Sequence, residues 1–260
     1  MATPRSDGDV PVPPDVPGGP GVPGDPDAAG DGRRQPAGRR RLSVGQRRRE
    51  ILAATLRLLS SRPASQLSID DIAEAAGASR ALIYHYFHTK EALYIAAVRS
   101  ACDDLKSRLR PPPAHPFEQV RLAGQGYLDF AEENKAEFVA LLRGSARAGG
   151  EADEPALIME ELRQHIIDLV TSSLGVANPS PVVRASLRGW VAMMEVISLD
   201  WLERRNLTRD QVRRLLANQL GAVLVAAAAD DEDLSRAFAR AVATADPDRL
   251  PLWARGVGAA

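Results

Sequence analysis

The sequence predicts an all-α fold, in which a small N-terminal three-helix domain precedes a larger helical domain. From residue 43 onward, apolar residues recur at the three- and four-residue spacing of amphipathic helices. No segment alternates between polar and apolar residues as a half-buried strand does. Proline and glycine clusters interrupt the helical pattern, and the prolines at 111–113 separate the two domains.

The composition indicates a globular chain with little material for metal chemistry. The chain has 260 residues, which is long enough to bury a core without disulfides or a structural metal. Its single cysteine, Cys102, excludes a disulfide framework and a cysteine-based zinc cluster, and its four histidines offer few further ligands. We therefore expect no bound metal and no cofactor.

The hydropathy pattern predicts no membrane segment. The longest apolar run, residues 220–229, falls well short of the roughly 18 to 20 residues that a spanning helix needs. The N-terminus lacks the basic stretch and apolar core of a secretory signal. These features predict a cytoplasmic protein without a membrane partner.

The charge is unevenly distributed although its sum is close to zero. The chain carries 33 basic and 34 acidic residues, a formal net charge of -1. Residues 1–32 carry -5, residues 33–90 carry +8 and residues 91–260 carry -4. Such a basic block is typical of a surface that meets polyphosphate or an anionic membrane, and equally typical of a solvated arginine-rich stretch.

Residues 1–42 are predicted to form a disordered acidic segment that ends in a basic arm. The first 36 residues contain nine of the nineteen prolines and seven of the twenty glycines, with too few large apolar side chains to offset the entropy of ordering. Arginines at 33, 34 and 39–41 then form the arm. It either follows DNA phosphates or a minor groove, or acts as a non-specific tether.

The N-terminal domain is predicted to span residues 43–108. Apolar residues at helical spacing predict a first helix that ends near Arg62-Pro63. A longer helix begins near Thr89 and continues to the proline triplet. Two shorter helices lie between them, and their arrangement determines the functional prediction.

The two short helices have the spacing of a helix-turn-helix over residues 68–87. Ser68 and Ser79 are placed to cap them, and Gly77 can adopt the left-handed conformation that ends the first. On the second helix, Ile83 and Phe87 lie four residues apart and are expected to face the core. The opposite face then points to solvent near the helix N-terminus, as it does in a recognition helix that enters the major groove of DNA.

The residues of this segment resemble those of a known family. The run SRALIYHYFHTKEAL (79–93) and the run SIDDIAEAAG (68–77) are similar to two successive helices of the TetR/AcrR family of bacterial repressors. The resemblance covers about residues 45–105. It implies a dimeric regulator that binds an inverted-repeat operator in double-stranded DNA and is released by a small, largely apolar ligand.

The resemblance also assigns roles to individual residues. Side chains on the recognition helix face the groove, where Arg80 can donate a bidentate pair to guanine, and others hold phosphates. Two departures leave the base contacts open: Pro63 replaces the usual glycine after the first helix, and Ala81 stands where glycine is frequent. The expected DNA-binding residues are Ser68, Ser79, Arg80, Ala81, Leu82, Tyr84, His85, Tyr86 and Lys90.

The larger domain, residues 114–245, contains six predicted helical segments, followed by a tail at 246–260. The segments 180–205 and 209–229 are long, apolar and joined by a short turn, which predicts an antiparallel hairpin. We expect two such hairpins to form a homodimer through residues 180–229, unless these faces only complete the core of one chain. The residues expected at this interface are Leu215, Leu216, Leu220, Gly221, Ala222, Val223 and Leu224. The other four segments are 116–133, 135–147, 154–174 and 231–245.

The resemblance implies a ligand pocket in the larger domain. Large apolar side chains with a few polar anchors usually line such pockets, and methionine adapts to varied ligands. Aromatic and methionine side chains at helical spacing more often belong to an ordinary core, and His165 suits a core or boundary position better than an anchor. The candidates are Tyr127, Phe130, Phe138, Leu142, Met159, His165, Trp190, Met193 and Met194.

Two other classes of function fit part of the sequence. A helical small-molecule carrier with a vestigial helix-turn-helix would bind a ligand without selecting a DNA sequence. An enzyme would need a catalytic arrangement, and the sequence has no glycine-rich phosphate loop, no histidine pair with metal-ligand spacing and no Ser, His and Asp set that periodicity places together. We therefore expect a transcriptional regulator and not an enzyme.

Overall fold

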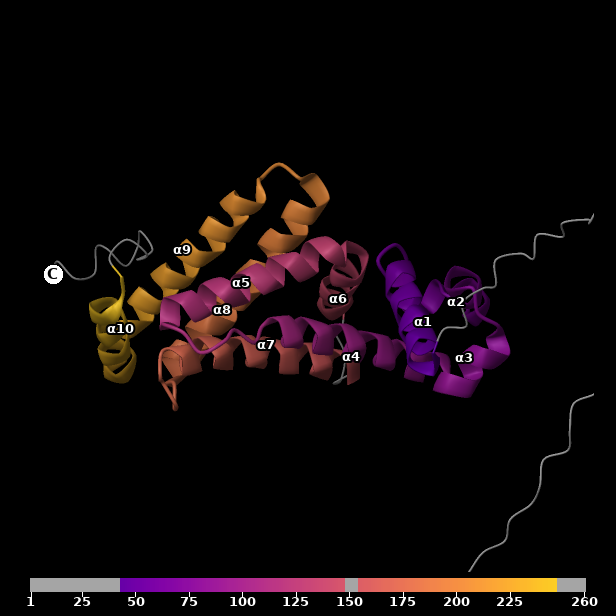
Figure 1. The fold of residues 1–260 in the computed structure, drawn as a ribbon, viewed down its shortest axis with the longest axis horizontal. Helices are drawn as coiled ribbons and strands as arrows, with labels where there is room; N and C mark the ends of the chain where they lie inside the picture. The colour runs from indigo at the N-terminus through magenta and orange to yellow at the C-terminus, as the bar shows by residue number, and fades with distance from the viewer. Residues whose placement is uncertain (1–42, 148–153, 247–260) are drawn as a thin grey trace, which may run out of the picture. The chain divides into compact units, whose positions relative to one another are not determined.

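The computed structural model describes residues 43–147 and 154–246, and over these ranges it contains helices and no strand, as the sequence predicts (Figure 1). The predicted disordered segment 1–42, the predicted break at Gly149-Gly150 and all but the first residue of the predicted tail lie outside the described residues. The described helices share one hydrophobic core, which continues past Leu109 at the predicted boundary between domains.

The N-terminal helices begin and end at local sequence signals. The first helix starts at Ser43, whose Oγ accepts from the Gln46 N–H at 3.2 Å while the Ser43 N–H donates to Gln46 Oε1 at 2.9 Å. This reciprocal pair satisfies two backbone donors of the first turn. The elements are α1 (Val44–Leu59), the 3-10 turn η1 (Ala64–Gln66), α2 (Ile69–Ala76), α3 (Arg80–Phe87) and α4 (Lys90–Arg108).

The first helix ends earlier than the predicted Arg62-Pro63. The hydroxyls of Ser60 and Ser61 donate to the carbonyls of Arg57 and Leu58 at 2.7 and 2.9 Å. Such side-chain bonds compete with the continuing helical ladder and favour its end. Pro63 then precedes η1 in an extended conformation, at φ -65° and ψ 153°.

The larger domain has the six predicted helices. The hairpin prediction is confirmed: α8 and α9 pack along each other, and Arg205 in the left-handed conformation ends α8 before Thr208 caps α9. The elements are α5 (Pro116–Glu133), α6 (Lys135–Arg147), α7 (Glu154–Ser173), α8 (Pro181–Arg204), α9 (Arg209–Ala228) and α10 (Glu232–Thr244).

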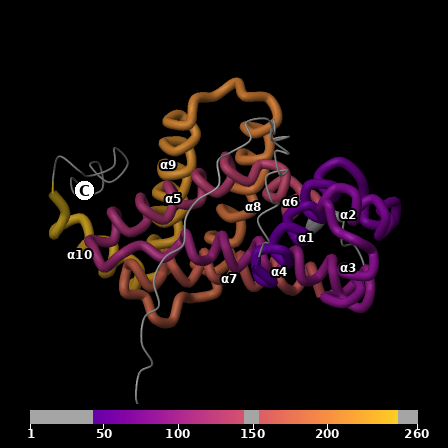
Figure 2. Tube along the Cα trace, turned by 45° about the vertical axis from the view of Figure 1, so that its right-hand side comes forward, coloured from indigo at the N-terminus to yellow at the C-terminus, as the bar shows by residue number. Residues whose placement is uncertain are grey.

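Two helices connect the N-terminal helices to the larger domain. The α4 helix packs against α1 and α3 and extends to α5 and α7 (Figures 1 and 2). The α6 helix packs against both α1 and α8, where Arg143 donates to the Ser60 carbonyl at 3.3 Å and to Glu203 Oε1 at 2.5 Å. Arg143 therefore bridges the end of α1 and α8.

Candidate functional site

The predicted helix-turn-helix is formed by α2 and α3. Gly77 ends α2 in the left-handed conformation, at φ 57° and ψ 38°. The Asp71 N–H donates to Ser68 Oγ at 3.1 Å, and the Ser68 N–H donates to Asp71 Oδ2 at 2.8 Å. The N–H and the hydroxyl of Ser68 both donate to the Asp71 carboxylate. Both bonds favour its charged form and therefore lower the pKa of Asp71. Ser79 caps α3 by accepting from the Leu82 N–H at 3.2 Å.

The two faces of α3 differ as the sequence predicts. Ile83 and Phe87 are 1% and 4% exposed and belong to the core that contains Ile72. On the opposite face, Tyr84 is 40% exposed. Of the predicted DNA-binding residues, the exposed ones are Ser68, Ser79, Arg80, Ala81, Tyr84 and His85, and the half-buried ones are Leu82, Tyr86 and Lys90.

Two of these side chains have partners within the chain. Arg80 Nη1 lies 3.2 Å from Asp70 Oδ2, in a pair whose side chains are both mostly exposed. An exposed pair of this kind contributes little free energy, so Arg80 can exchange Asp70 for another acceptor. The Lys90 ammonium donates to the Leu67 carbonyl at 2.9 Å. An ammonium has three donors, and this bond holds Lys90 at the start of α4 without using the other two.

Arg48 at the start of α1 also lies beside α3, and the residue-level prediction missed it. The guanidinium of Arg48 stands over the Phe87 ring, 5.2 Å from its centroid. Arg47 and Arg49 are its sequence neighbours, and both are exposed or half-buried. Arg48 is part of the positively charged block of residues 33–90, but the sequence did not show that α1 starts close to the end of α3.

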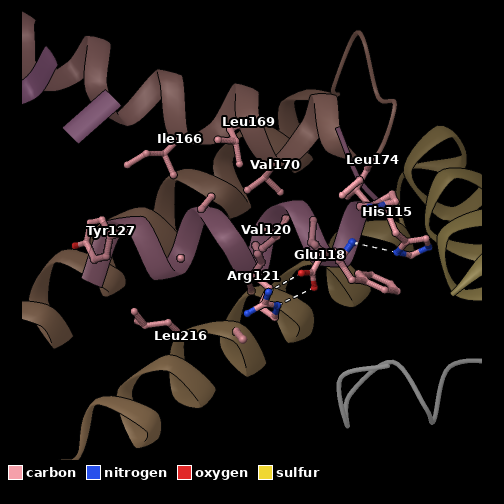
Figure 3. Close-up of a pocket in the computed structure, with 18 of the residues that line it drawn as sticks. His115, Glu118, Val120, Arg121, Tyr127, Ile166, Leu169, Val170, Leu174 and Leu216 are labelled. Carbon is pink, nitrogen blue, oxygen red and sulfur yellow. Dashed lines mark hydrogen bonds and ion pairs between the residues drawn. The ribbon is translucent and has the colours of Figure 1, made fainter. Parts of the chain in front are cut away.

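A cavity of about 610 Å³ lies in the larger domain between α5, α7, α8 and α9 (Figure 3). Such a volume is typical of a site for a small organic molecule. Three predicted pocket residues line it: Tyr127, Trp190 and Met194. The other apolar residues that line the cavity include Leu109, Phe117, Val120, Leu128, Ile166, Leu169, Val170, Leu174, Leu216, Leu220 and Leu224.

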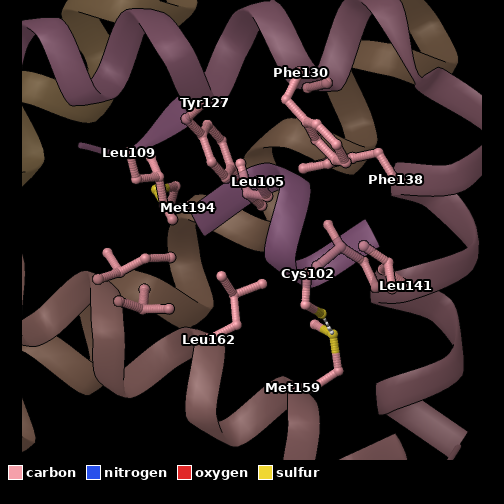
Figure 4. Close-up of a cluster of buried hydrophobic side chains, with 14 of the residues drawn as sticks. Cys102, Leu105, Leu109, Tyr127, Phe130, Phe138, Leu141, Met159, Leu162 and Met194 are labelled. Atoms are coloured by element: carbon pink, nitrogen blue, oxygen red, sulfur yellow. Dashed lines mark hydrogen bonds between the residues drawn. The ribbon is translucent and has the colours of Figure 1, made fainter. Parts of the chain in front are cut away.

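The remaining pocket candidates lie outside this cavity. Phe138 packs edge-on against Tyr127 and Phe130, and Cys102 Sγ lies 3.7 Å from Met159 Sδ, in the buried cluster of Figure 4. Phe138, Leu142 and Met159 border only a void of about 10 Å³, which is hardly large enough for one water molecule. Met193 is partly buried against the core.

His165 lies on α7 without lining the cavity. Its Nε2 is buried and has no hydrogen-bond partner among the described residues. Burial lowers the pKa of its imidazole, and the nearby charges of Lys106 and Arg110 lower it further. His165 thus lies at the edge of the core, as the sequence predicts, with an unpartnered Nε2 and in surroundings that disfavour its charged form.

The apolar residues of α9 are not distributed as predicted. Leu216, Leu220 and Leu224 are buried and line the cavity, so they cannot form the expected interface of the hairpin. Gly221 is also buried, whereas Leu215 and Ala222 are exposed. The expected role of the three leucines at an interface was therefore wrong, because both faces of α9 are apolar and the sequence did not show which one packs against α5.

An exposed apolar stripe follows α8 instead. It recurs every three or four residues, so its members share one side of the helix. At its end, Val196 is 67% exposed. At its middle, a Cβ added to Gly189 would have no neighbour within 4 Å, although a glycine inside a helix costs about 1 kcal/mol relative to alanine. The stripe consists of Val182, Ala185, Gly189, Ala192 and Val196.

The helices give no sign of a membrane-spanning element. Within the described ranges, none is both long enough and apolar enough to cross a bilayer.

Comparisons with known proteins identify both halves of the chain. Residues 51–97 match the family described as bacterial regulatory proteins, tetR family, and residues 116–223 match the tetracyclin repressor-like C-terminal domain. The crystal structure of a tetR-family transcriptional regulator from Streptomyces coelicolor is similar to this chain, with 32% identity and a TM-score of 0.68. That match covers 80% of this chain and 93% of the other.

Two curated relatives are HTH-type transcriptional regulators. EthR of Mycolicibacterium smegmatis is 32% identical over 125 residues, which are 46% of this chain and 54% of EthR. RutR of Escherichia coli O157:H7 is 26% identical over 63% of this chain and 70% of its own length. This chain thus spans about half the length of EthR in that match. The family profiles, the Streptomyces structure and the helix-turn-helix agree, and the chain belongs to the TetR family of bacterial regulatory proteins.

Proposed function

We propose that the protein is a dimeric, sequence-specific DNA-binding transcriptional repressor, which a small, largely apolar ligand releases from an inverted-repeat operator in the cytoplasm. The observation that carries this proposal is the division of α3 into two faces. Ile83 and Phe87 anchor the helix in the core, and Arg80, Tyr84 and His85 project from its first two turns. A helix held this way can place its N-terminal half in a major groove.

The capped starts of α2 and α3 support the same function. Ser68 and Ser79 fix the first turns of both helices, whose free N–H groups and positive dipole ends favour phosphates. Arg48, whose guanidinium lies over the Phe87 ring, adds positive charge next to α3. This charge supplies salt-dependent affinity for the DNA backbone, while Arg80 and its neighbours supply selectivity.

The exposed stripe on α8 supports a homodimer. Gly189 and Ala192 would allow two α8 helices to approach closely, and Val182 and Val196 would bury apolar surface at either end. Leu215 and Val225 are further exposed apolar residues on α9, which packs along α8. A twofold axis through this surface would form a four-helix interface and relate two copies of α3, as an inverted repeat requires.

The release by a ligand rests on contacts between the cavity and the N-terminal helices. The α5 and α7 helices line the cavity and pack against α4, which carries α3. A ligand that binds one arrangement of these helices more tightly shifts the population toward it. The spacing of the two α3 helices would then no longer match two half-sites.

The double substitution of Arg80→Ala and Tyr84→Ala tests this function. Both side chains are largely exposed, so the fold should survive. A lost base contact costs about 1–3 kcal/mol, so we expect at least a ten-fold loss of affinity for a selected DNA at fixed salt. Arg240→Ala, on the exposed side of α10, is the control with the same loss of charge. Unchanged affinity in the double variant would refute the proposal.

The cavity by itself would also suit a helical small-molecule carrier with a vestigial helix-turn-helix. That alternative predicts ligand binding together with equal affinity for all DNA sequences. The same titration separates the two functions when it is repeated with a scrambled duplex. We propose no enzymatic activity, since the relatives named above are transcriptional regulators.

A further inference from the structure

We infer that the cavity binds an elongated aliphatic carboxylate, with its chain between α5, α7 and α9 and its carboxylate at the opening between α5 and α9, beside Arg121 and Arg213. This inference deepens the proposed function, since it assumes that the cavity is the effector site. It depends on the form of the cavity, the pairing of its inner polar groups and the positions of its charges.

The cavity is long. Its lining residues on α5 run from Pro116 to Leu128, and at about 1.5 Å per residue this segment is roughly 18 Å long. The lining residues on α9 run from Arg213 to Leu224, which is roughly 16 Å. A compact ring system would leave much of this length empty, whereas an extended chain would fill it.

The inner polar groups are already paired within the protein. The Tyr127 hydroxyl donates to Ser198 Oγ at 3.2 Å, and Ser198 Oγ donates to the Met194 carbonyl at 2.7 Å. The Trp190 Nε1–H donates to the Leu216 carbonyl at 3.2 Å. Burial raises the pKa of Tyr127, which keeps the hydroxyl neutral. A polar group on the inner part of a ligand would lack a hydrogen-bond partner there, so that part of the ligand must be apolar.

The inner lining favours an aliphatic chain over an aromatic one. Leucine, isoleucine and valine from α5, α7 and α9 supply most of it, and aromatic rings are few. Aromatic ligands gain specificity from stacked or edge-on rings, which this surface provides at few points. Flexible methylenes can instead follow the branched side chains.

The ionisable side chains that line the cavity are Glu118 and Arg121 on α5, Arg213 on α9, His115 at the start of α5 and Asp246 after α10. Arg121 donates to both oxygens of Glu118, with Nε–Oε2 at 2.7 Å and Nη2–Oε1 at 2.5 Å, on the side of α5 that faces Leu216 (Figure 3). These two charges offset each other. Among the residues that the structure describes, the ion-pair partner of Arg213 on α9 is Asp210, at 3.3 Å, and Asp210 does not line the cavity. An exposed pair of this kind is weak, so Arg213 can turn to a ligand.

The two arginines are on facing helices. Arg209, one turn before Arg213, pairs with Asp129 and Glu132 near the end of α5. The start of α5 lies beside α10, which follows α9, because His115 Nε2 lies 3.0 Å from the Ala241 carbonyl oxygen. The two helices are therefore antiparallel, and one turn along α9 places Arg213 nearer the middle of α5, toward Arg121. The planar guanidinium of Arg213 can bind both oxygens of a carboxylate that remains partly hydrated at the opening.

A titration with three twelve-carbon probes tests the inference. Dodecanoate, dodecanol and dodecyltrimethylammonium share one chain and differ in charge, and each is titrated calorimetrically into the delipidated full chain below its micelle concentration. We expect dodecanoate to bind at least about ten-fold more tightly than dodecanol, because its carboxylate can accept charge-assisted hydrogen bonds, and the cation to bind least. Decanoate should bind about ten-fold more weakly than dodecanoate, because two buried methylenes are lost.

Substitutions of single arginines test which residue binds the carboxylate. Arg213→Gln should remove the preference for dodecanoate and leave dodecanol binding unchanged, and that unchanged binding also shows that the cavity is intact. Arg214→Gln is the matched control, because Arg214 is exposed and does not line the cavity. Equal binding of acid and alcohol, or an unaffected Arg213→Gln variant, would overturn the carboxylate assignment. Absence of binding by all three probes would overturn the chain class, while the Arg80 and Tyr84 titration would still report independently on DNA recognition.

Discussion

Substitution of Gly126 on α5 by alanine tests how closely α4 packs against the larger domain. A Cβ at this position would lie 2.3 Å from the Arg108 carbonyl oxygen and 3.1 Å from its carbon. Ordinary contacts of this kind begin at about 3.3 Å, so Gly126→Ala should displace the end of α4 by about 1 Å. Overpacking of this kind typically costs about 1–3 kcal/mol.

Gly124 provides a matched control on the same helix. A Cβ there would have no neighbour within 4 Å, and both substitutions gain the same helix propensity, about 1 kcal/mol. The difference in unfolding free energy between the two variants therefore isolates the steric cost. Urea unfolding followed by circular dichroism should find Gly126→Ala less stable than Gly124→Ala by about 1–3 kcal/mol. Equal stability would refute the close approach of α4 and α5.

Three further substitutions address the helix caps and the dimer. Ser79→Ala should lower the free energy of unfolding by about 1 kcal/mol in urea titration, since Leu82 loses its capping acceptor. The pKa of the Asp71 carboxylate lies below its ordinary value of 3.8. The charged carboxylate therefore stabilises the folded protein above pH 3.8, and this contribution is lost as the pH falls through the lowered pKa. The stability difference between wild type and Asp71→Asn, measured in urea, should therefore shrink with acid. Val196→Asp should give monomers in light scattering, because it places a charge on the exposed stripe of α8.

Each of these results has a control and a contrary outcome. Ser235→Ala, within α10 and exposed, should not destabilise the protein, and a similar loss there would remove the capping argument. A stability difference for Asp71→Asn that is constant down to acid pH would show that its charge is not stabilised by Ser68. Ala239→Asp, also exposed on α10, should leave the dimer intact, and a dimeric Val196→Asp variant would exclude the α8 stripe from the interface.

Local signals made the helices predictable. Ser68, Gly77 and Ser79 each act through their own turn, and the elements they delimit match the prediction closely. The same holds for the two faces of α3, because the spacing of Ile83 and Phe87 places both on one side of the helix. The exception, the end of α1, also has a local cause, namely the serine hydroxyls that bond back to the last turn.

The cavity and the interface could not be predicted in the same way. Phe130 and Leu216 are both apolar, both buried and both on amphipathic helices, yet only Leu216 borders the cavity. Whether a buried residue borders the cavity depends on where α5 and α9 cross. That crossing is a property of the packed helices, and the apolar pattern of neither helix shows it. Small residues such as Gly189 lie on the exposed stripe of α8, but their spacing in the sequence does not show which side of α8 packs against the rest of the chain.

Selection of bound sequences from random duplex DNA by the purified protein, at near-physiological salt, tests the central claim most directly. The proposed function predicts an enriched inverted repeat, whose half-site spacing would give the distance between the two α3 helices of a dimer. Arg80→Ala should then relax the preference at one base pair of each half-site. Recovery of no motif, with binding that disappears as salt rises, would show that the contact with DNA is only electrostatic and would contradict a sequence-specific repressor.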